Sequence, residues 1–176
     1  VTGVQTCALP ISFIFLIAAT IVDATDGWLA RWLRVKERLP HFDGALLDNI
    51  VDFLTYVFVP ALIVFQARLV PSAFPICSAM VVSSLYGFSN AAAKVERDGQ
   101  YFFTGFPSYW NIVVGYLYLL QWPEPVNAAV LAVLAILVFV PIRYVYPSRM
   151  TTMRAPTLLL GTMWGVLFAW MLWRLP

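Results

Sequence analysis

Charged side chains are scarce in this sequence of 176 residues. Only 11% of the residues are Asp, Glu, Lys or Arg, whereas 61% are hydrophobic, and the mean hydropathy is +0.81. Soluble domains carry about 25% charged residues, so the charges here are too few to cover a surface that faces water. The net charge of +2 is also too small to indicate nucleic-acid binding. The composition therefore argues against an ordinary soluble domain and predicts a membrane protein.

Cysteine and histidine are equally rare. The two cysteines, Cys7 and Cys77, lack the spacing of metal ligands, and a disulfide framework would need more of them. The single histidine, His41, fits a solvated loop position better than contact with a phosphate. Chemistry based on thiolates or imidazoles is therefore disfavoured, and the carboxylates become the main candidates for a functional site.

Apolar runs near 20 residues recur along the chain. A helix of that length crosses a hydrocarbon core of ~30 Å, and backbone groups in lipid must form their hydrogen bonds internally. We therefore expect an all-α, polytopic transmembrane helix bundle with about six spans, the second of them kinked at Pro60. The expected spans cover residues 12–31, 44–65, 72–92, 108–122, 126–146 and 157–173.

The basic residues predict the orientation of these spans. Nine of the eleven Lys and Arg residues follow the first, third and fifth spans, and only Arg68 and Arg174 fall on the other side. Cytoplasmic loops carry such an excess of Lys and Arg. We therefore expect a multi-pass membrane protein whose basic connections face the cytoplasm. The nine residues are Arg31, Arg34, Lys36, Arg38, Lys94, Arg97, Arg143, Arg149 and Arg154.

Four aspartates lie at the cytoplasmic ends of the first two spans. Asp23 and Asp26 are three residues apart, and Asp48 and Asp52 are four apart, so each pair shares a helix face. Carboxylates placed close together repel one another unless cations neutralise them, and oxygen ligands suit Mg²⁺, Mn²⁺ or Ca²⁺. A single aspartate at a helix end is as readily a cap or a solvated residue, but the four together favour a metal site for phosphoryl transfer.

Small residues and an arginine accompany the aspartates. Gly27 and Ala30 flank the first pair, and Gly44 precedes the second pair. Small side chains allow helices and ligands to approach closely. Arg31 lies one turn after Gly27, where its guanidinium could pair with a phosphate. Asp43 is expected to cap the helix that begins at Gly44.

The spacing of these residues resembles the signature of the CDP-alcohol phosphatidyltransferases. All eight signature positions are present, and they are Asp23, Asp26, Gly27, Ala30, Arg31, Gly44, Asp48 and Asp52. The family has eight residues between the arginine and the second glycine, whereas this chain has twelve, residues 32–43. That longer spacing, together with the stretches FTGFPSYWN at 103–111 and PIRYVYPSR at 141–149, resembles the bacterial phosphatidylcholine synthases.

The resemblance implies a reaction and a set of roles. CDP-diacylglycerol and choline would give phosphatidylcholine and CMP, with Mn²⁺ or Mg²⁺ as the cofactor, bound as two ions. Asp52 would complete the metal site and act as the general base on the choline hydroxyl. The metal would bind Asp23, Asp26, Asp48 and Asp52, and the CDP group would contact Asp23, Asp26, Gly27, Ala30, Arg31 and Gly44.

Aromatic residues before the fourth span form a candidate choline pocket. Quaternary ammonium groups are recognised by aromatic faces, and Phe106, Tyr109 and Trp110 lie on the same predicted side as the aspartates. An aromatic belt at the membrane interface explains each of these rings better when the ring is taken on its own. The pocket is therefore a hypothesis that rests on position and residue type.

Two other functions stay open at this stage. Another acceptor, such as serine, glycerol phosphate or inositol phosphate, would keep the same metal site, although a phosphorylated acceptor would favour a cluster of cations. An ion-coupled transporter would also place carboxylates in the membrane, but near the midplane and without an adjacent arginine for phosphate.

Further expectations concern the N-terminal residues, the domain bounds and the oligomeric state. Residues 1–11, VTGVQTCALPI, resemble translated sequencing-adapter read-through, and we leave them out of the functional argument. The membrane domain is then expected to cover residues 12–176 and to lack at least one N-terminal helix that the family has. The family resemblance also implies a homodimer.

Overall fold

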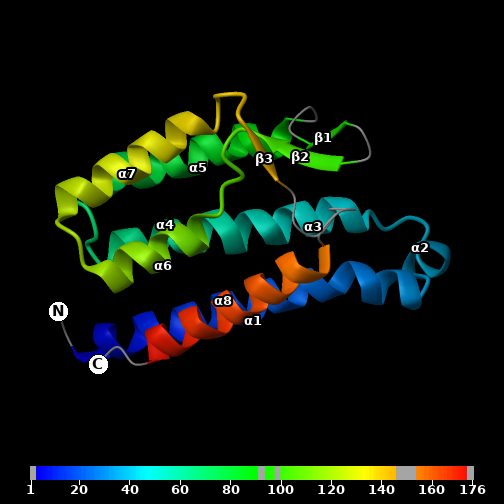
Figure 1. The fold of residues 1–176 in the computed structure, drawn as a ribbon, viewed down its shortest axis with the longest axis horizontal. Helices are drawn as coiled ribbons and strands as arrows, with labels where there is room; N and C mark the ends of the chain where they lie inside the picture. Colours follow the sequence, from blue (N-terminus) through cyan, green and yellow to red (C-terminus); the bar gives the residue numbers. More distant parts are fainter. Residues whose placement is uncertain (1–2, 91–93, 98–99, 146–153, 174–176) are drawn as a thin grey trace.

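The computed structural model describes residues 3–90, 94–97, 100–145 and 154–173. Long helices run side by side, alternating in direction, and α8 lies beside α1 (Figure 1). This arrangement confirms the predicted all-α membrane bundle. Its helices are α1 (Gly3–Trp32), α2 (Val35–Arg38), α3 (Gly44–Phe53), η1 (Leu54–Phe58), α4 (Val59–Gln66), α5 (Ala73–Ser89), α6 (Trp110–Leu120), α7 (Glu124–Leu137) and α8 (Arg154–Trp173).

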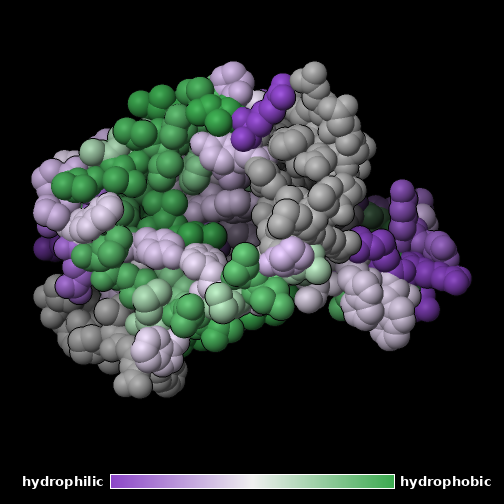
Figure 2. Space-filling model, viewed as in Figure 1, coloured by the Kyte–Doolittle hydropathy of each residue, from purple (hydrophilic) through white to green (hydrophobic). Residues whose placement is uncertain are grey.

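Two helical stretches have the length of membrane spans, and the bundle has an apolar surface. Two helical stretches, Leu9–Trp32 and Gly44–Gln66, are long and apolar enough to cross a bilayer, and four shorter apolar stretches accompany them. Large apolar side chains stay exposed, among them Phe15 at 71% and Phe74 at 76%, which suits contact with lipid. Figure 2 shows hydrophobic residues over the body of the bundle and a hydrophilic group at the right-hand end, where α2 lies.

The second span is continuous but irregular. α3, η1 and α4 follow one another, and η1 is a π-helical turn in which the Val59 N–H donates to the carbonyl of Leu54. Pro60 lies directly after this turn and has no N–H to donate, which accounts for the departure from α-helical bonding. The irregularity expected at Pro60 is therefore present, as a π turn that begins six residues earlier.

The fifth span is shorter than the sequence predicts, and a small sheet follows it. α7 ends at Leu137 instead of continuing to Tyr146, which lies outside the described residues, as does the predicted end of the third span at Ala92. Strand β3 (Arg143–Val145) then pairs antiparallel with β2 (Gln100–Thr104), and β2 pairs with β1 (Lys94–Arg97). The connections after α5 and α7 are thereby joined by backbone hydrogen bonds.

The core lies between the helices and is almost entirely apolar. Met80, Trp110, Val114 and Leu131 are fully buried in it. α6 and α8 meet where the Phe168 ring covers Gly115, since a Cβ at this glycine would come within 2.4 Å of the ring. The close contact fixes α8 against the side of α6.

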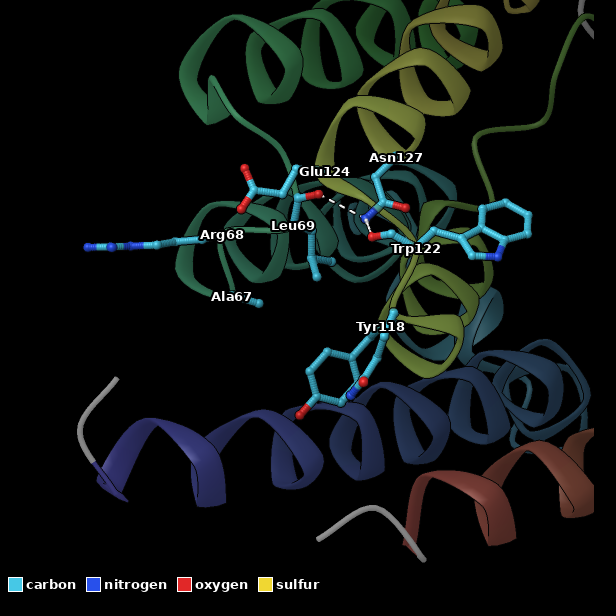
Figure 3. A pocket seen from close by; sticks show the side chains of 8 residues that line it. Ala67, Arg68, Leu69, Tyr118, Trp122, Glu124 and Asn127 are labelled. Atoms are coloured by element: carbon cyan, nitrogen blue, oxygen red, sulfur yellow. Dashed lines mark hydrogen bonds between the residues drawn. The ribbon is translucent and has the colours of Figure 1, made fainter.

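Connections between helices gather at the two ends of the bundle. In Figure 1, α2 lies at the right-hand end, and the strands lie between the middle of the view and that end, beyond the ends of α5 and α7; these are the connections predicted to be cytoplasmic. At the other end, a cavity of about 240 Å³ lies beside Asn127 (Figure 3). The buried Asn127 amide donates to the carbonyls of Leu69 at 2.9 Å and Trp122 at 3.3 Å. This asparagine therefore ties two turns together at the end away from the aspartates.

Candidate functional site

Two helix ends bring three carboxylates together. Asp23 and Asp26 lie in the C-terminal part of α1, and Asp48 lies in the second turn of α3. One carboxylate oxygen from each residue lies within 4.8 Å of the other two. In an octahedral Mg²⁺ site with bonds of ~2.1 Å, neighbouring ligands are about 3.0 Å apart and opposite ligands about 4.2 Å apart. The three oxygens would therefore have to move closer together to bind one divalent cation of this size.

The local structure explains why the carboxylates converge. Asp26 follows Asp23 by three positions, so both lie on one face of α1. Asp43 caps α3 as predicted, because its side chain accepts the Leu46 N–H at 3.0 Å. The cap starts the helix at Gly44 and places Asp48 one turn later. The connection through α2 returns the chain so that the start of α3 faces the end of α1 (Figure 1).

The fourth aspartate lies one turn deeper than this group. Asp52 is half-buried and follows Asp48 by four residues on α3, whereas Asp48 itself is exposed. The group of three mutually close oxygens contains Asp48 and leaves Asp52 outside it. Asp52 is therefore placed beside the cluster, where a carboxylate could act on a substrate held by the other three.

Tyr56 joins the aspartates through a contact that sequence reasoning missed. Its hydroxyl donates to Asp23 Oδ2 at 2.8 Å, linking η1 to α1. Asp48, Asp52 and Tyr56 are spaced by four residues each, so they follow one face of the second span. That spacing was the available signal, but a tyrosine within an apolar run also reads as a packing residue.

The small signature residues lie at the surface near the carboxylates. A Cβ at Gly27 would lie 3.4 Å from Arg31 Nη1, which shows that the guanidinium folds back along its own helix toward this glycine. A Cβ at Gly44 would meet no atom within 4 Å, and Ala30 and Arg31 are exposed. These four residues are therefore accessible at the helix ends that carry the aspartates.

The three candidate choline-pocket residues have different environments. Trp110 is 0% exposed, and its indole N–H donates to Ser84 Oγ at 2.7 Å. Phe106 packs edge-on against Trp110, with ring centroids 5.1 Å apart. Tyr109 is half-buried, and its ring lies 6.0 Å from that of Tyr56. Tyr109 is therefore the member of the three that the structure places next to the aspartate cluster.

A glycine anchors the segment that carries these rings. Gly105 has a φ of +84°, and a Cβ there would lie 2.2 Å from the carbonyl oxygen of Val138. Its N–H donates to Ile142 at 2.8 Å, and the N–H of Phe106 donates to Leu137 at 3.0 Å. The Phe106 bond occupies the Leu137 carbonyl at the end of α7, which Pro141 could not bond in a continuing helix because it has no N–H.

A polar contact ties α6 to α1 close to the site. Asn111 in the first turn of α6 donates from Nδ2 to Thr20 Oγ1 at 3.4 Å, and Thr20 donates to the carbonyl of Leu16 at 2.9 Å. Thr20 precedes Asp23 by one turn on α1. Asn111 therefore has the helix-linking role expected of a buried amide, and it helps to hold the aspartate-bearing end of α1 in place.

Comparison with known proteins supports the signature. Residues 4–144 match the family model described as CDP-alcohol phosphatidyltransferase. The chain is 43% identical over 141 residues to the phosphatidylcholine synthase of Legionella pneumophila, covering 78% of this chain and 54% of that protein. It is 46% identical over 134 residues to the phosphatidylcholine synthase of Legionella bozemanae, covering 74% and 60%. The corresponding protein of Rhizobium meliloti is 38% identical over 157 residues, covering 88% and 64%.

The shared region is a large part of this chain but a smaller part of its relatives. The chain spans between 54% and 64% of the length of these three proteins. The matched segment nevertheless contains the four aspartates, the two signature glycines and the arginine between them. On this evidence the chain belongs to the CDP-alcohol phosphatidyltransferase family.

Proposed function

We propose that this chain transfers a phosphatidyl group from CDP-diacylglycerol to choline, giving phosphatidylcholine and CMP. The convergence of the Asp23, Asp26 and Asp48 carboxylates within 4.8 Å carries the proposal, because an anionic diphosphate needs cations between itself and three carboxylates. Relatives that bear the name phosphatidylcholine synthase support choline as the acceptor.

Different residues of the chain would bind the cation and the CDP group. Asp23, Asp26 and Asp48 would hold Mg²⁺ or Mn²⁺, with Asp52 completing the set. The bound cation would supply positive charge that stabilises the negative charge developing on the phosphate oxygens. Arg31 offers a planar guanidinium, which pairs with phosphate through two parallel hydrogen bonds. Gly27, Ala30 and Gly44 leave the space that the CDP group would occupy.

Asp52 would provide the base for the reaction. An alcohol is a weak nucleophile at neutral pH, and a nearby carboxylate that accepts its proton strengthens it. The choline oxygen forms a bond to the phosphorus that carries diacylglycerol, and the choline proton passes to Asp52. The bond from that phosphorus to the bridging oxygen breaks, and CMP leaves with the electron pair.

The proposal also assigns the site to the cytoplasmic leaflet of the bacterial inner membrane. Nine of the eleven basic residues of the sequence follow the first, third and fifth predicted spans, and the positive-inside rule places such connections in the cytoplasm, on the side where the aspartate-bearing ends of the first two spans are expected. Water-soluble choline and CMP would exchange at this end, while the acyl chains of both lipids stay in the bilayer.

An acceptor panel tests this function. The chain, purified into lipid nanodiscs with CDP-diacylglycerol and Mn²⁺, is supplied with choline, serine, glycerol 3-phosphate or inositol phosphate, and CMP release is measured. We expect release with choline and a loss of at least 100-fold in Asp52→Asn, the size of effect that general-base removal produces. Release that depends on serine or a phosphorylated alcohol instead would overturn the choline assignment.

A further inference from the structure

Tyr56 lies outside the eight signature positions and contacts the site directly. Its hydroxyl donates to Asp23 Oδ2 at 2.8 Å, across 33 residues of sequence. Its ring lies beside that of Tyr109, with centroids 6.0 Å apart and an angle of 57° between the planes. One side chain therefore contacts both a carboxylate of the acidic cluster and an aromatic residue of the candidate choline pocket.

We propose that Tyr56 has two separable roles, which rest on the function proposed above. Its hydroxyl positions the Asp23 carboxylate for a divalent cation. Its ring, together with that of Tyr109, forms an aromatic wall that favours an acceptor with a quaternary ammonium group. Tyr56 is then a positioning residue through its oxygen and a specificity-determining residue through its ring.

The hydrogen bond supports the first role. A carboxylate has two oxygens and about four lone-pair sites, so a donor on Oδ2 leaves Asp23 with capacity to bind a cation. Partners that hydrogen-bond a metal-binding carboxylate fix its orientation, and removing such a partner weakens metal binding by about 10- to 100-fold. Asp23 lies on α1, whereas Tyr56 lies on the span that carries Asp48, so the bond also fixes the two helices relative to each other.

The helix geometry explains how Tyr56 reaches both neighbours. It is the central residue of the π-helical turn Leu54–Phe58, and such turns frequently occur at functional sites. The Val59 N–H stabilises the turn by bonding the carbonyl of Leu54. Pro60 has no N–H, so it cannot form the regular α-helical bond at this point. The wider turn lies between Asp52 and the regular helix α4, and from it Tyr56 reaches Asp23 on α1.

The ring contact supports the second role. Aromatic faces attract cations within about 6 Å of the ring centroid, and choline cannot donate a hydrogen bond from its nitrogen. Tyr56 and Tyr109 come from different elements and are both half-buried. Their tilted arrangement presents more than one aromatic surface beside the carboxylates, which a neutral or phosphorylated acceptor would not use.

Two substitutions separate the roles. Tyr56→Phe removes the hydroxyl and keeps the ring, whereas Tyr56→Leu removes both. Mn²⁺ binding is measured by electron paramagnetic resonance on the purified chain in nanodiscs without substrate, and the KM for choline is measured by CMP release at saturating Mn²⁺. Tyr118→Phe is the matched control, since it removes a tyrosine hydroxyl near the opposite end of the bundle, at the cavity of Figure 3.

The expected results differ between the two variants. Tyr56→Phe should weaken Mn²⁺ binding by at least tenfold, keep the choline KM within twofold, and recover its rate when Mn²⁺ is raised. Tyr56→Leu should weaken Mn²⁺ binding equally and raise the choline KM by about 2- to 30-fold. Tyr118→Phe should match the wild-type chain in both measurements.

Each role can fail independently. Wild-type Mn²⁺ affinity in Tyr56→Phe overturns the positioning role, and an unchanged choline KM in Tyr56→Leu overturns the role of the ring. If the wild-type chain uses another acceptor, the proposed function fails and the ring role fails with it. The Mn²⁺ measurement needs no acceptor, so it still decides whether Tyr56 positions Asp23.

Discussion

Replacing Gly105 by alanine should destabilise the protein by an amount that follows from its backbone geometry. Gly105 has a φ of +84°, and an added Cβ would lie 2.2 Å from the Val138 carbonyl oxygen and 3.1 Å from its carbon. A left-handed backbone costs a residue with a side chain roughly 1–2 kcal/mol. Forcing an atom into packed structure adds about 1–3 kcal/mol. The expected loss is therefore about 2–5 kcal/mol, because the contact is with backbone and cannot be relieved by rotating a side chain.

Thermal unfolding in detergent measures this loss. For a chain of this size, about 2–5 kcal/mol corresponds to a midpoint lowered by roughly 4–20 °C. Gly161→Ala on α8 is the matched control, because a Cβ there meets nothing within 4 Å and alanine favours the helix. If Gly105→Ala and Gly161→Ala unfold at the same temperature, the segment around Gly105 is not held tightly against the backbone at the end of α7.

Three further predictions concern the carboxylates and the helix contacts. Asp48→Asn should weaken Mn²⁺ binding by more than tenfold, measured by electron paramagnetic resonance. Asp43→Asn should leave binding unchanged, since asparagine caps a helix as well as aspartate does. Equal losses in both variants would contradict a role for Asp48 in holding the metal. Removing divalent ions with EDTA should abolish CMP release and added Mn²⁺ should restore it, whereas activity that survives EDTA would exclude metal dependence. Gly115→Ala should lower the unfolding midpoint because its Cβ would lie 2.4 Å from the Phe168 ring. Adding Phe168→Leu to this variant should recover part of the loss. If the effects of the two substitutions on stability simply add, the two positions are not coupled.

Much of the bundle could be predicted because its signals are local. Apolar runs of membrane-spanning length mark the helices, and the start of the second span at Gly44 agrees with the structure to the residue. The cap at Asp43 follows from residue type and position alone. The convergence of Asp23, Asp26 and Asp48 was also within reach, because helix spacing and the direction of alternating spans bring their ends together.

The sheet could not be predicted in the same way. Pairs such as Phe102 with Val145 and Thr104 with Arg143 join segments about 40 residues apart, and the local sequence pattern does not specify which residues pair. The end of α7 did have a local signal, because Pro141 has no N–H for the Leu137 carbonyl and disfavours helix at the residue before it. The N–H of Phe106, from a distant segment, bonds that carbonyl instead.

The aromatic residues show a different limit of sequence reasoning. Phe106, Tyr109 and Trp110 are equivalent candidates by residue type, yet Trp110 is buried against Ser84, while Tyr109 faces Tyr56. Burial is decided by neighbouring helices, so the sequence alone could not rank the three. The same dependence on neighbours hid Tyr56, whose importance comes from a helix 33 residues earlier in the chain.

The strand order has a consequence for how the protein is made. The hairpin of β1 and β2 can form as soon as residue 104 has left the ribosome, because its partners are adjacent in the chain. Pairing of Thr104 with Arg143 must wait for 39 further residues to be synthesised, and both α6 and α7 are made in that interval. The third strand therefore joins the sheet only after these two helices exist, so the sheet is completed late in biogenesis.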